Sequence, residues 1–352
     1  MESILSCIER IPSALQNILE NKELYLKGLK NAISERSIDE IIFIGSGTSN
    51  TAAVTAAPFV EMVSGLRTTA VTSNEFMYDR YIRNKKGLYV FTSQTGTSHF
   101  VREAQKRFRE EGYLTAAVSE SEDTPLAKES AVFVNMGSGE EGCPMRTIGY
   151  CASVLIHMLM GLEIGKVYGN LSNEDYQEYI KEAGQLSNSH EEIRKAALVW
   201  MDTARRRMFR SQLLAFTGAG PLYGLALEGA MKVWECPQIA SVGYELEEGM
   251  HGPNYGYNSN HCVIFLNDGR EEKKGLALAK WMKEINKNGF VIGNHVVDDT
   301  DLKVELMTEH FTAIEISAAV QTIAYRLAYD GGRDLLSPHD NSVMESYFKT
   351  HD

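Results

Sequence analysis

Three residues in the second half of the chain could carry acid–base chemistry. Lys232 and Glu235 stand three residues apart on the helix predicted after Gly220, so they share one helix face. A shielded carboxylate can take up and return a proton, although such a pair is also common as a surface ion pair. His251 precedes Gly252-Pro253, which predicts a turn. Imidazole changes charge near neutral pH and can act as acid or base, although many loop histidines are inert.

A hydroxyl-rich loop in the first half could bind an anion. This loop, Thr92 to Ser98, has the sequence TSQTGTS, with five hydroxyl residues in seven positions. It follows an apolar run that predicts a strand, and it precedes residues whose apolar side chains recur at helical spacing. Backbone N–H groups and hydroxyls at a helix N-terminus suit a phosphate. The alternative is that Thr97 or Ser98 simply caps the helix.

The elements that position these residues predict an α/β fold. The apolar run from Ile41 ends in Gly45-Ser46-Gly47-Thr48-Ser49, and a helix of small residues follows. This pattern is typical of the opening unit of a phosphate-binding sheet, although a plain strand–helix connection would look the same. Further strands and helices alternate over about 100 residues, which predicts a mostly parallel sheet with helices on both faces.

The opening pattern returns at Leu213 as LLAFTGAG. Gly45 and Gly218 stand 173 residues apart, each between a predicted strand and a predicted helix, which indicates an internal duplication. The second copy has no counterpart of the hydroxyl-rich loop, so we expect one phosphate site per chain. Its later predicted elements are strands at His261–Leu266, Phe290–Val297 and Phe311–Ile316, and helices at Lys273–Asn288 and Ala318–Tyr329.

The composition is that of a globular protein of 352 residues, with 43% hydrophobic and 23% charged residues. A formal net charge of −12 argues against a nucleic-acid surface. We expect no membrane span, because the longest apolar stretch, Ile148 to Leu162, is interrupted by Gly149, His157 and Gly161. We also expect no secretion signal, because the start MESILSCIERIPS has no basic residues followed by a long apolar stretch. The five cysteines are scattered without a CxxC, which fits reduced thiols in the cytoplasm and argues against a zinc site. No metal or cofactor is predicted.

Four motifs together resemble the sugar isomerase (SIS) family. They are GSGTS at 45–49, TSQTGTS at 92–98, ALEGAMKVWE at 226–235 and EEGMHGP at 247–253. The chain looks most like the tandem SIS isomerase half of glucosamine-6-phosphate synthase and the related fructosamine-6-phosphate deglycases and phosphosugar isomerases. This resemblance implies two flavodoxin-like SIS domains in tandem, each with a five-stranded parallel sheet. The expected ranges are a helical arm at 1–36, SIS domains at 37–168 and 209–330, a helical linker at 169–208, and a tail at 331–352 over the active site.

The resemblance also implies roles for individual residues. Glu235 matches the family's proton shuttle between sugar carbons 1 and 2, and Lys232 matches a lysine that accompanies it. His251 matches a ring-opening histidine that the neighbouring subunit supplies, which implies a homodimer. The residues that match the family's phosphate- and sugar-binding positions are Thr48, Ser49, Ser93, Gln94, Thr95 and Ser98.

Two departures from the family pattern bear on the reaction. We expect no glutamine-hydrolysing domain, because position 2 is not a cysteine, and the tail from Ser337 lacks the family's Schiff-base lysine. A substrate that brings its own amine does not need that lysine. The sequence therefore favours a fructosamine-6-phosphate deglycase, or a related isomerase or deaminase, acting on a 6-phosphorylated sugar or ketosamine. The alternatives are a non-catalytic phosphosugar-binding regulator and a subunit supplied with ammonia by a partner.

Overall fold

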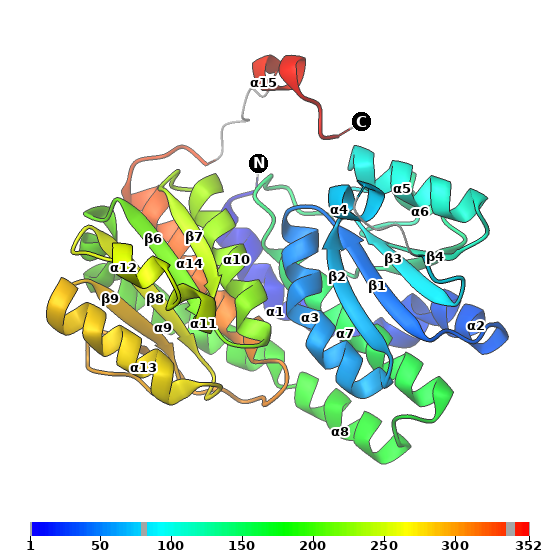
Figure 1. Ribbon diagram of the computed structural model, residues 1–352, viewed down its shortest axis with the longest axis horizontal. Helices are drawn as coiled ribbons and strands as arrows, with labels where there is room; N and C mark the ends of the chain where they lie inside the picture. Colours follow the sequence, from blue (N-terminus) through cyan, green and yellow to red (C-terminus); the bar gives the residue numbers. More distant parts are fainter. Residues whose placement is uncertain (1, 79–82, 336–341, 352) are drawn as a thin grey trace. The chain divides into compact units, whose positions relative to one another are not determined.

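The computed structural model describes residues 2–78, 83–335 and 342–351. The chain divides into two compact units. Unit 1 comprises residues 1–12, 142–147 and 182–336, and unit 2 comprises residues 13–141, 148–181 and 337–352. Each unit is built on its own five-stranded parallel sheet (Figure 1).

The sheet of unit 2 has the strand order β2-β1-β3-β4-β5. Successive residues of β1 point to opposite faces, and both faces are covered. Ile42 and Ile44 join a core cluster with Phe76 and Phe108, whereas the ring of Phe43 lies 4.4 Å from that of His157 on the other face. The five strands are β1 (Glu40–Gly45), β2 (Arg67–Thr72), β3 (Gly87–Thr92), β4 (Leu114–Ser119) and β5 (Val132–Asn135).

Helices flank this sheet, and the one containing His157 is apolar all round. That helix, α7 (Ile148–Tyr168), is long and apolar enough to cross a membrane, but its most apolar stretch is fully buried, as expected of a core helix. It packs against α3 (Thr48–Ser64). The other helices are α1 (Ile4–Tyr25), α2 (Lys27–Glu35), α4 (Ser73–Tyr78), α5 (His99–Glu110), α6 (Pro125–Lys128), α8 (Asn173–Ala183) and, in the tail, α15 (Ser342–Tyr347).

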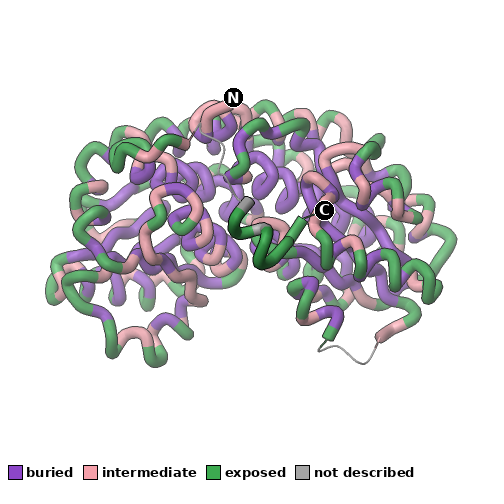
Figure 2. The backbone as a smooth tube through the Cα atoms, turned by 90° about the horizontal axis from the view of Figure 1, so that it is seen from above, coloured by how far each residue is buried: buried purple, intermediate pink, exposed green. Residues whose placement is uncertain are grey.

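The sheet of unit 1 has the order β10-β9-β8-β6-β7, which repeats the order of unit 2. Its strands are β6 (Leu213–Gly218), β7 (Ser241–Glu245), β8 (His261–Asn267), β9 (Gly289–Gly293) and β10 (Leu302–Lys303). Its helices are α9 (Leu186–Phe209), α10 (Pro221–Glu235), α11 (Leu246–Gly249), α12 (Pro253–Gly256), α13 (Glu272–Trp281) with a π-helical turn at Met282–Asn286, and α14 (Thr312–Asp330). Figure 2 shows that buried residues follow the inner stretches of the backbone and exposed residues its outer turns.

The duplication reaches the detail of the backbone. Gly47 and Gly220 precede the first helix residue of α3 and α10, with φ of 59° and 57° and ψ of −133° and −129°. A positive φ of this kind favours glycine, which has no Cβ to clash. The two-fold α/β architecture predicted from the sequence is therefore confirmed.

Several predicted elements differ from the structure. Phe311–Ile316 is not a separate element, because α14 begins at Thr312 and Glu315 is buried as a helix residue that accepts hydrogen bonds from Ser189 and Thr308. The alternation of Ile314, Glu315 and Ile316 resembles a strand pattern, which explains the error. The short strands β7 and β10 were not predicted. The predicted domain and linker ranges stay predictions; within 169–208, the helix α9 packs along α14 of unit 1.

Candidate active site

The hydroxyl-rich loop follows β3 and ends where α5 begins. Ser93 donates its backbone N–H to Val118 O at 3.1 Å, and Gln94 O accepts the N–H of Glu120 at 3.0 Å, so the neighbouring β4 fixes the start of the loop. Gly96 has φ of 66°, and a Cβ there would lie 2.6 Å from Cβ of Thr124. The loop is thus tightly built, and glycine is required at this bend.

The hydroxyl groups of the loop bond to one another. Ser93 and Ser98 share a hydrogen bond of 3.0 Å between their Oγ atoms, and Thr95 and Thr97 share one of 2.8 Å between their Oγ1 atoms. Ser98 occupies the N-cap position of α5, but its side chain makes no capping hydrogen bond. The alternative that Ser98 simply caps the helix is therefore not what the structure shows.

Thr48 and Ser49 begin α3, directly after β1. Strands β1 and β3 are parallel neighbours, with Ile44 opposite Phe91, so the segments that follow them emerge at the same edge of the sheet (Figure 1). This edge, where the order of strands reverses between β1 and β3, is where sheets of this order bind ligands. Five of the predicted binding residues, Thr48, Ser49, Ser93, Thr95 and Ser98, lie at this edge.

Gln94, the sixth predicted binding residue, is turned inward. Its side chain donates from Nε2 to Oε2 of Glu141 at 3.2 Å, and the residue is 8% exposed. Beneath the start of the loop, Thr92 shares a hydrogen bond of 2.9 Å between Oγ1 and Nε2 of His157. Burial lowers the pKa of His157 to about 3, so its ring is neutral at physiological pH.

The end of the chain reaches this loop. Ser98 pairs with His351 in an antiparallel bridge, and His99 donates its backbone N–H to Thr350 O at 3.1 Å. The tail therefore contacts the first N–H of α5. The predicted departure at Ser337–Asn341 lies outside the described residues.

Lys232 and Glu235 meet at the C-terminal end of α10. Lys232 Nζ lies 2.5 Å from Oε2 of Glu235 and 3.4 Å from Oε1 of Glu228. The lysine side chain is 1% exposed and that of Glu228 is fully buried, whereas that of Glu235 is 36% exposed. Burial alone would lower the pKa of Lys232, but the carboxylates of Glu228 and Glu235 outweigh it and raise that pKa. The alternative of a surface ion pair is therefore wrong, because the cation is buried.

His251 lies on the turn after α11, and its side chain is 66% exposed. Its Nδ1 is 2.9 Å from the backbone oxygen of Glu247 and 3.6 Å from Oε1 of the same residue. No contact between His251 and Glu235 or Lys232 occurs among the residues that the structure describes. The structure thus brings the lysine and the glutamate together and leaves the histidine apart from them on this chain.

Sequence reasoning gave no role to four residues that support these sites. They are Glu228, which neutralises Lys232, and Glu141, Gly149 and His157, which lie against the hydroxyl-rich loop. Glu228 stands four residues before Lys232, a spacing that could have indicated the contact. The other three act through tertiary contacts that leave no local pattern.

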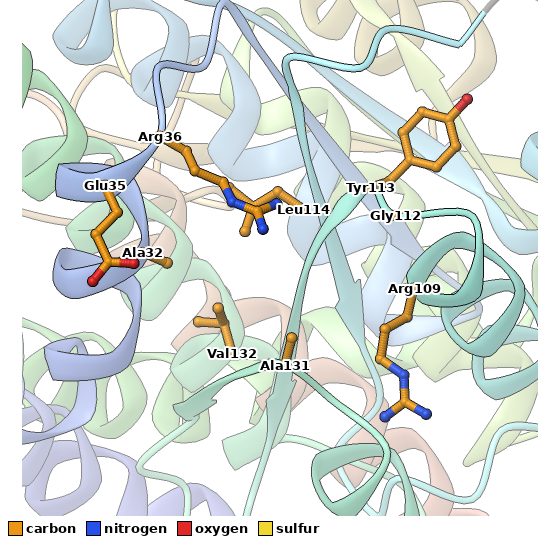
Figure 3. A pocket seen from close by; sticks show the side chains of 9 residues that line it. All are labelled: Ala32, Glu35, Arg36, Arg109, Gly112, Tyr113, Leu114, Ala131 and Val132. Atoms are coloured by element: carbon orange, nitrogen blue, oxygen red, sulfur yellow. The ribbon is translucent and has the colours of Figure 1, made fainter.

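A surface pocket of about 310 Å³ lies elsewhere in unit 2 (Figure 3). It is lined by Leu114 and Val132 at the starts of β4 and β5, and by the exposed Arg36 and Arg109. Because the hydroxyl-rich loop follows the end of β3, this pocket is at the opposite edge of the sheet. It contains none of the candidate residues.

Comparisons with known proteins agree with this architecture. No family model matches the chain. It is 29% identical over 224 residues to glutamine–fructose-6-phosphate aminotransferase (isomerizing) of Tropheryma whipplei strain Twist, which covers 62% of this chain and 35% of the relative. The corresponding protein of Shouchella clausii strain KSM-K16 is 24% identical over 311 residues, covering 86% of this chain and 50% of the relative. The chain thus spans half or less of the length of these two curated relatives.

Solved structures match over nearly the whole chain. A candidate phosphosugar isomerase of Clostridium difficile 630 has a TM-score of 0.91 at 24% identity, covering 99% of this chain and 98% of that one. The C-terminal domain of glucosamine-fructose-6-phosphate aminotransferase from Francisella tularensis has a TM-score of 0.86 at 19% identity, covering 96% and 98%. The chain therefore has the tandem sugar isomerase (SIS) fold of these structures. Tagatose-6-phosphate ketose/aldose isomerase from Escherichia coli shares this SIS fold, with a TM-score of 0.73 at 16% identity over 96% of each chain.

Proposed function

We propose that this SIS protein is an enzyme that converts a 6-phosphorylated sugar. The reaction we favour is the cleavage of a fructosamine 6-phosphate to an aldose phosphate and a free amine. A related aldose–ketose isomerisation or deamination would use the same groups. The names of the similar proteins, which include a ketose/aldose isomerase and aminotransferases of sugar phosphates, support this class of substrate.

The observation that carries the proposal is the arrangement of Glu228, Lys232 and Glu235. The buried Lys232 cation is held against Glu235, whose carboxylate is the partly exposed member of the group. Glu228 compensates the charge of the buried Lys232. The lysine can therefore hold the carboxylate of Glu235 in place without leaving an uncompensated charge in the core. Glu235 is therefore fixed in position while one part of it stays accessible, as a proton shuttle requires.

The hydroxyl-rich loop and the start of α3 would hold the phosphate. They bring hydroxyls and the N-termini of two helices, α3 and α5, to one edge of a parallel sheet. Phosphate binding far from the reacting carbons supplies binding energy that orients the substrate.

The proposed reaction moves two protons and breaks one carbon–nitrogen bond. Glu235 takes the proton from C1 of the open-chain ketosamine and returns it to C2, while the C2 carbonyl oxygen gains a proton and the amine nitrogen on C1 loses one, so the C2 ketone becomes an alcohol and C1 becomes an imine. Water then adds to C1, and the amine leaves with a proton to give the aldehyde of the aldose phosphate. The substrate supplies the nitrogen, so no enzyme amine enters the balance.

His251 would open the sugar ring by moving a proton between the ring oxygen and the hydroxyl. Its side chain is exposed and makes no described contact with Glu235 on the same chain. We therefore place it in the site of a second copy, in a homodimer. The cytoplasmic location stays a prediction.

Proton NMR in deuterated water tests the activity directly. The substrates are 6-phosphofructosyl-lysine, fructose 6-phosphate with ammonia, and glucosamine 6-phosphate. We expect free lysine and an aldose phosphate from the first, with deuterium at C2 to the extent that the proton held by Glu235 exchanges with solvent before it is returned. We also expect Glu235→Gln to slow that reaction about 10²- to 10⁴-fold. Full turnover by Glu235→Gln would exclude the shuttle role, and sugar-phosphate binding without turnover of any substrate would favour a non-catalytic regulator.

Subunit complementation tests the placement of His251. Glu235→Gln and His251→Ala are expressed separately and together. If His251 acts across a dimer, each mixed dimer regains one intact site, and random mixing restores about a quarter of wild-type activity. If His251 acts within its own chain, no mixed dimer has an intact site, and the mixture stays as inactive as its parents.

A further inference from the structure

Two residues outside the predicted site hold the side chain of Gln94. The first is Glu141, within the segment between β5 and α7, which is 4% exposed. Its carboxylate accepts hydrogen bonds from the backbone N–H groups of Ile148 and Gly149 at 3.1 Å each, and from Nε2 of Gln94 at 3.2 Å. One buried carboxylate thus caps α7 and binds the hydroxyl-rich loop at the same time.

The second residue is Gly149, in the first turn of α7. A Cβ at this position would lie 1.9 Å from Oε1 and 2.8 Å from Cδ of Gln94. The amide of Gln94 therefore occupies the space that any side chain at position 149 would need. Glu141 binds one end of this amide, and Gly149 leaves room for the other.

The inward direction of Gln94 affects which groups of the loop remain available. The side chain of Gln94 donates a hydrogen bond to Glu141, and the backbone oxygen of Gln94 accepts one from the backbone N–H of Glu120. In contrast, the backbone N–H groups of Thr95 and Thr97 donate to no acceptor among residues 2–78, 83–335 and 342–351. Unpaired N–H groups next to hydroxyls are the groups that bind an anionic oxygen.

We propose that Glu141 and Gly149 are positioning residues that set the phosphate affinity of the hydroxyl-rich loop by holding Gln94 inward. This inference rests on the proposed function, because it takes the loop to be the phosphate site. It assigns Gln94 an anchoring role beneath the loop, with the hydroxyls and N–H groups left to contact the phosphate.

Gly149→Ala isolates this effect. The added methyl group displaces a flexible amide and leaves both Glu141 and the loop backbone unchanged in sequence. Alanine is also a better helix residue than glycine, so the variant should remain folded. The control is to make the same change in Gln94→Ala, where no side-chain amide is present for the methyl group at position 149 to displace.

The experiment is calorimetric titration of fructose 6-phosphate, with unphosphorylated fructose as the reference, into four proteins: wild type, Gly149→Ala, Gln94→Ala and the double variant. We expect Gly149→Ala to weaken binding of the phosphorylated sugar about tenfold. We expect no further loss when the same change is made in the Gln94→Ala background. Thermal unfolding of each protein checks that it is folded.

A pH series gives a readout that general destabilisation would not produce. Gln94→Glu places a second carboxylate against Glu141, and the two repel unless one is protonated. The affinity of this variant relative to wild type should therefore rise as the pH falls, whereas that of the uncharged Gln94→Met should not follow pH.

The outcomes separate the two proposals. If wild type binds fructose 6-phosphate and Gly149→Ala binds it equally well, or loses as much in the Gln94→Ala background, the positioning role is wrong and the proposed function stands. The positioning role is also wrong if the affinity of Gln94→Glu relative to wild type does not change with pH. If wild type binds no sugar phosphate, both proposals are overturned.

Discussion

Replacing Lys232 with methionine should separate the structural and chemical roles of the buried charges. Methionine keeps most of the length of the lysine stem and removes the cation. Glu228, which is fully buried, then loses the charge that lies 3.4 Å from its Oε1. Removing one partner of a buried ion pair costs about 3 to 5 kcal/mol of unfolding free energy, because the buried carboxylate that remains loses its cation.

The double variant Lys232→Met/Glu228→Gln removes both charges. An amide and a thioether in the same space carry no uncompensated charge, so we expect most of the lost stability to return. Activity should not return with it, because Glu235 still lacks the cation 2.5 Å from its Oε2. Stability and turnover should therefore diverge between the single and the double variant.

The assay is urea unfolding at neutral pH together with turnover of the best substrate found by NMR. A loss below about 1 kcal/mol for Lys232→Met would refute the buried-charge argument. Equal losses for the single and double variants would show that packing, and not charge, is what Lys232 provides. Recovery of full activity in the double variant would remove Lys232 from the proposed mechanism.

Two further predictions concern unit 2. Burial lowers the pKa of His157 from 6.5 to about 3, so the unfolded chain binds a proton that the folded chain does not between these values, and stability falls with falling pH. When the pH is lowered from about 7 to about 5, wild type should lose about 2 kcal/mol more unfolding free energy than His157→Gln does. Thr92→Val should leave that dependence in place because desolvation causes it; an unchanged pH dependence in His157→Gln would contradict this reasoning. Gly96→Ala should cost more stability than Gly112→Ala, since both have positive φ, of 66° and 79°, but only Gly96 has a neighbour, Thr124, in the way. Equal melting temperatures for the two variants would show that the contact with Thr124 is relieved at no cost.

The fold could be predicted because its signals are local. Apolar runs that end in glycine or hydroxyl residues identified β1, β3, β4, β6 and β8, whose burial on both faces makes them nearly all apolar. Strands at the sheet margins gave weaker patterns. β10 has two residues, and β7 contains Gly243 and Tyr244 among partly exposed positions, so neither has a continuous apolar run.

The sequence predicted the candidate site residues themselves but not the buried residues that support them. Lys232 and Glu235 are helical neighbours, and the hydroxyl-rich loop is one continuous segment, so spacing alone pointed to both. Glu141 is 47 residues from Gln94, and His157 is 65 residues from Thr92. Contacts between residues so far apart in the sequence depend on where α7 and the segment before it pack, and no local sequence pattern encodes that packing.

The two copies of the SIS fold differ at the position where we expect the anion site. In unit 1 the segment after β8 corresponds to the hydroxyl-rich loop after β3, and it carries Asp268 and Arg270 in place of hydroxyls. Arg270 pairs with Asp268, which also accepts a hydrogen bond of 2.7 Å from Thr312. A Cβ on Gly220 would lie 3.3 Å from Cδ of Arg270, so the arginine side chain lies over the turn at Gly220. This turn is the counterpart in unit 1 of the turn at Gly47 in unit 2. The same backbone thus carries hydroxyls in one copy and is covered by its own ion pair in the other, which supports the expectation of one phosphate site per chain.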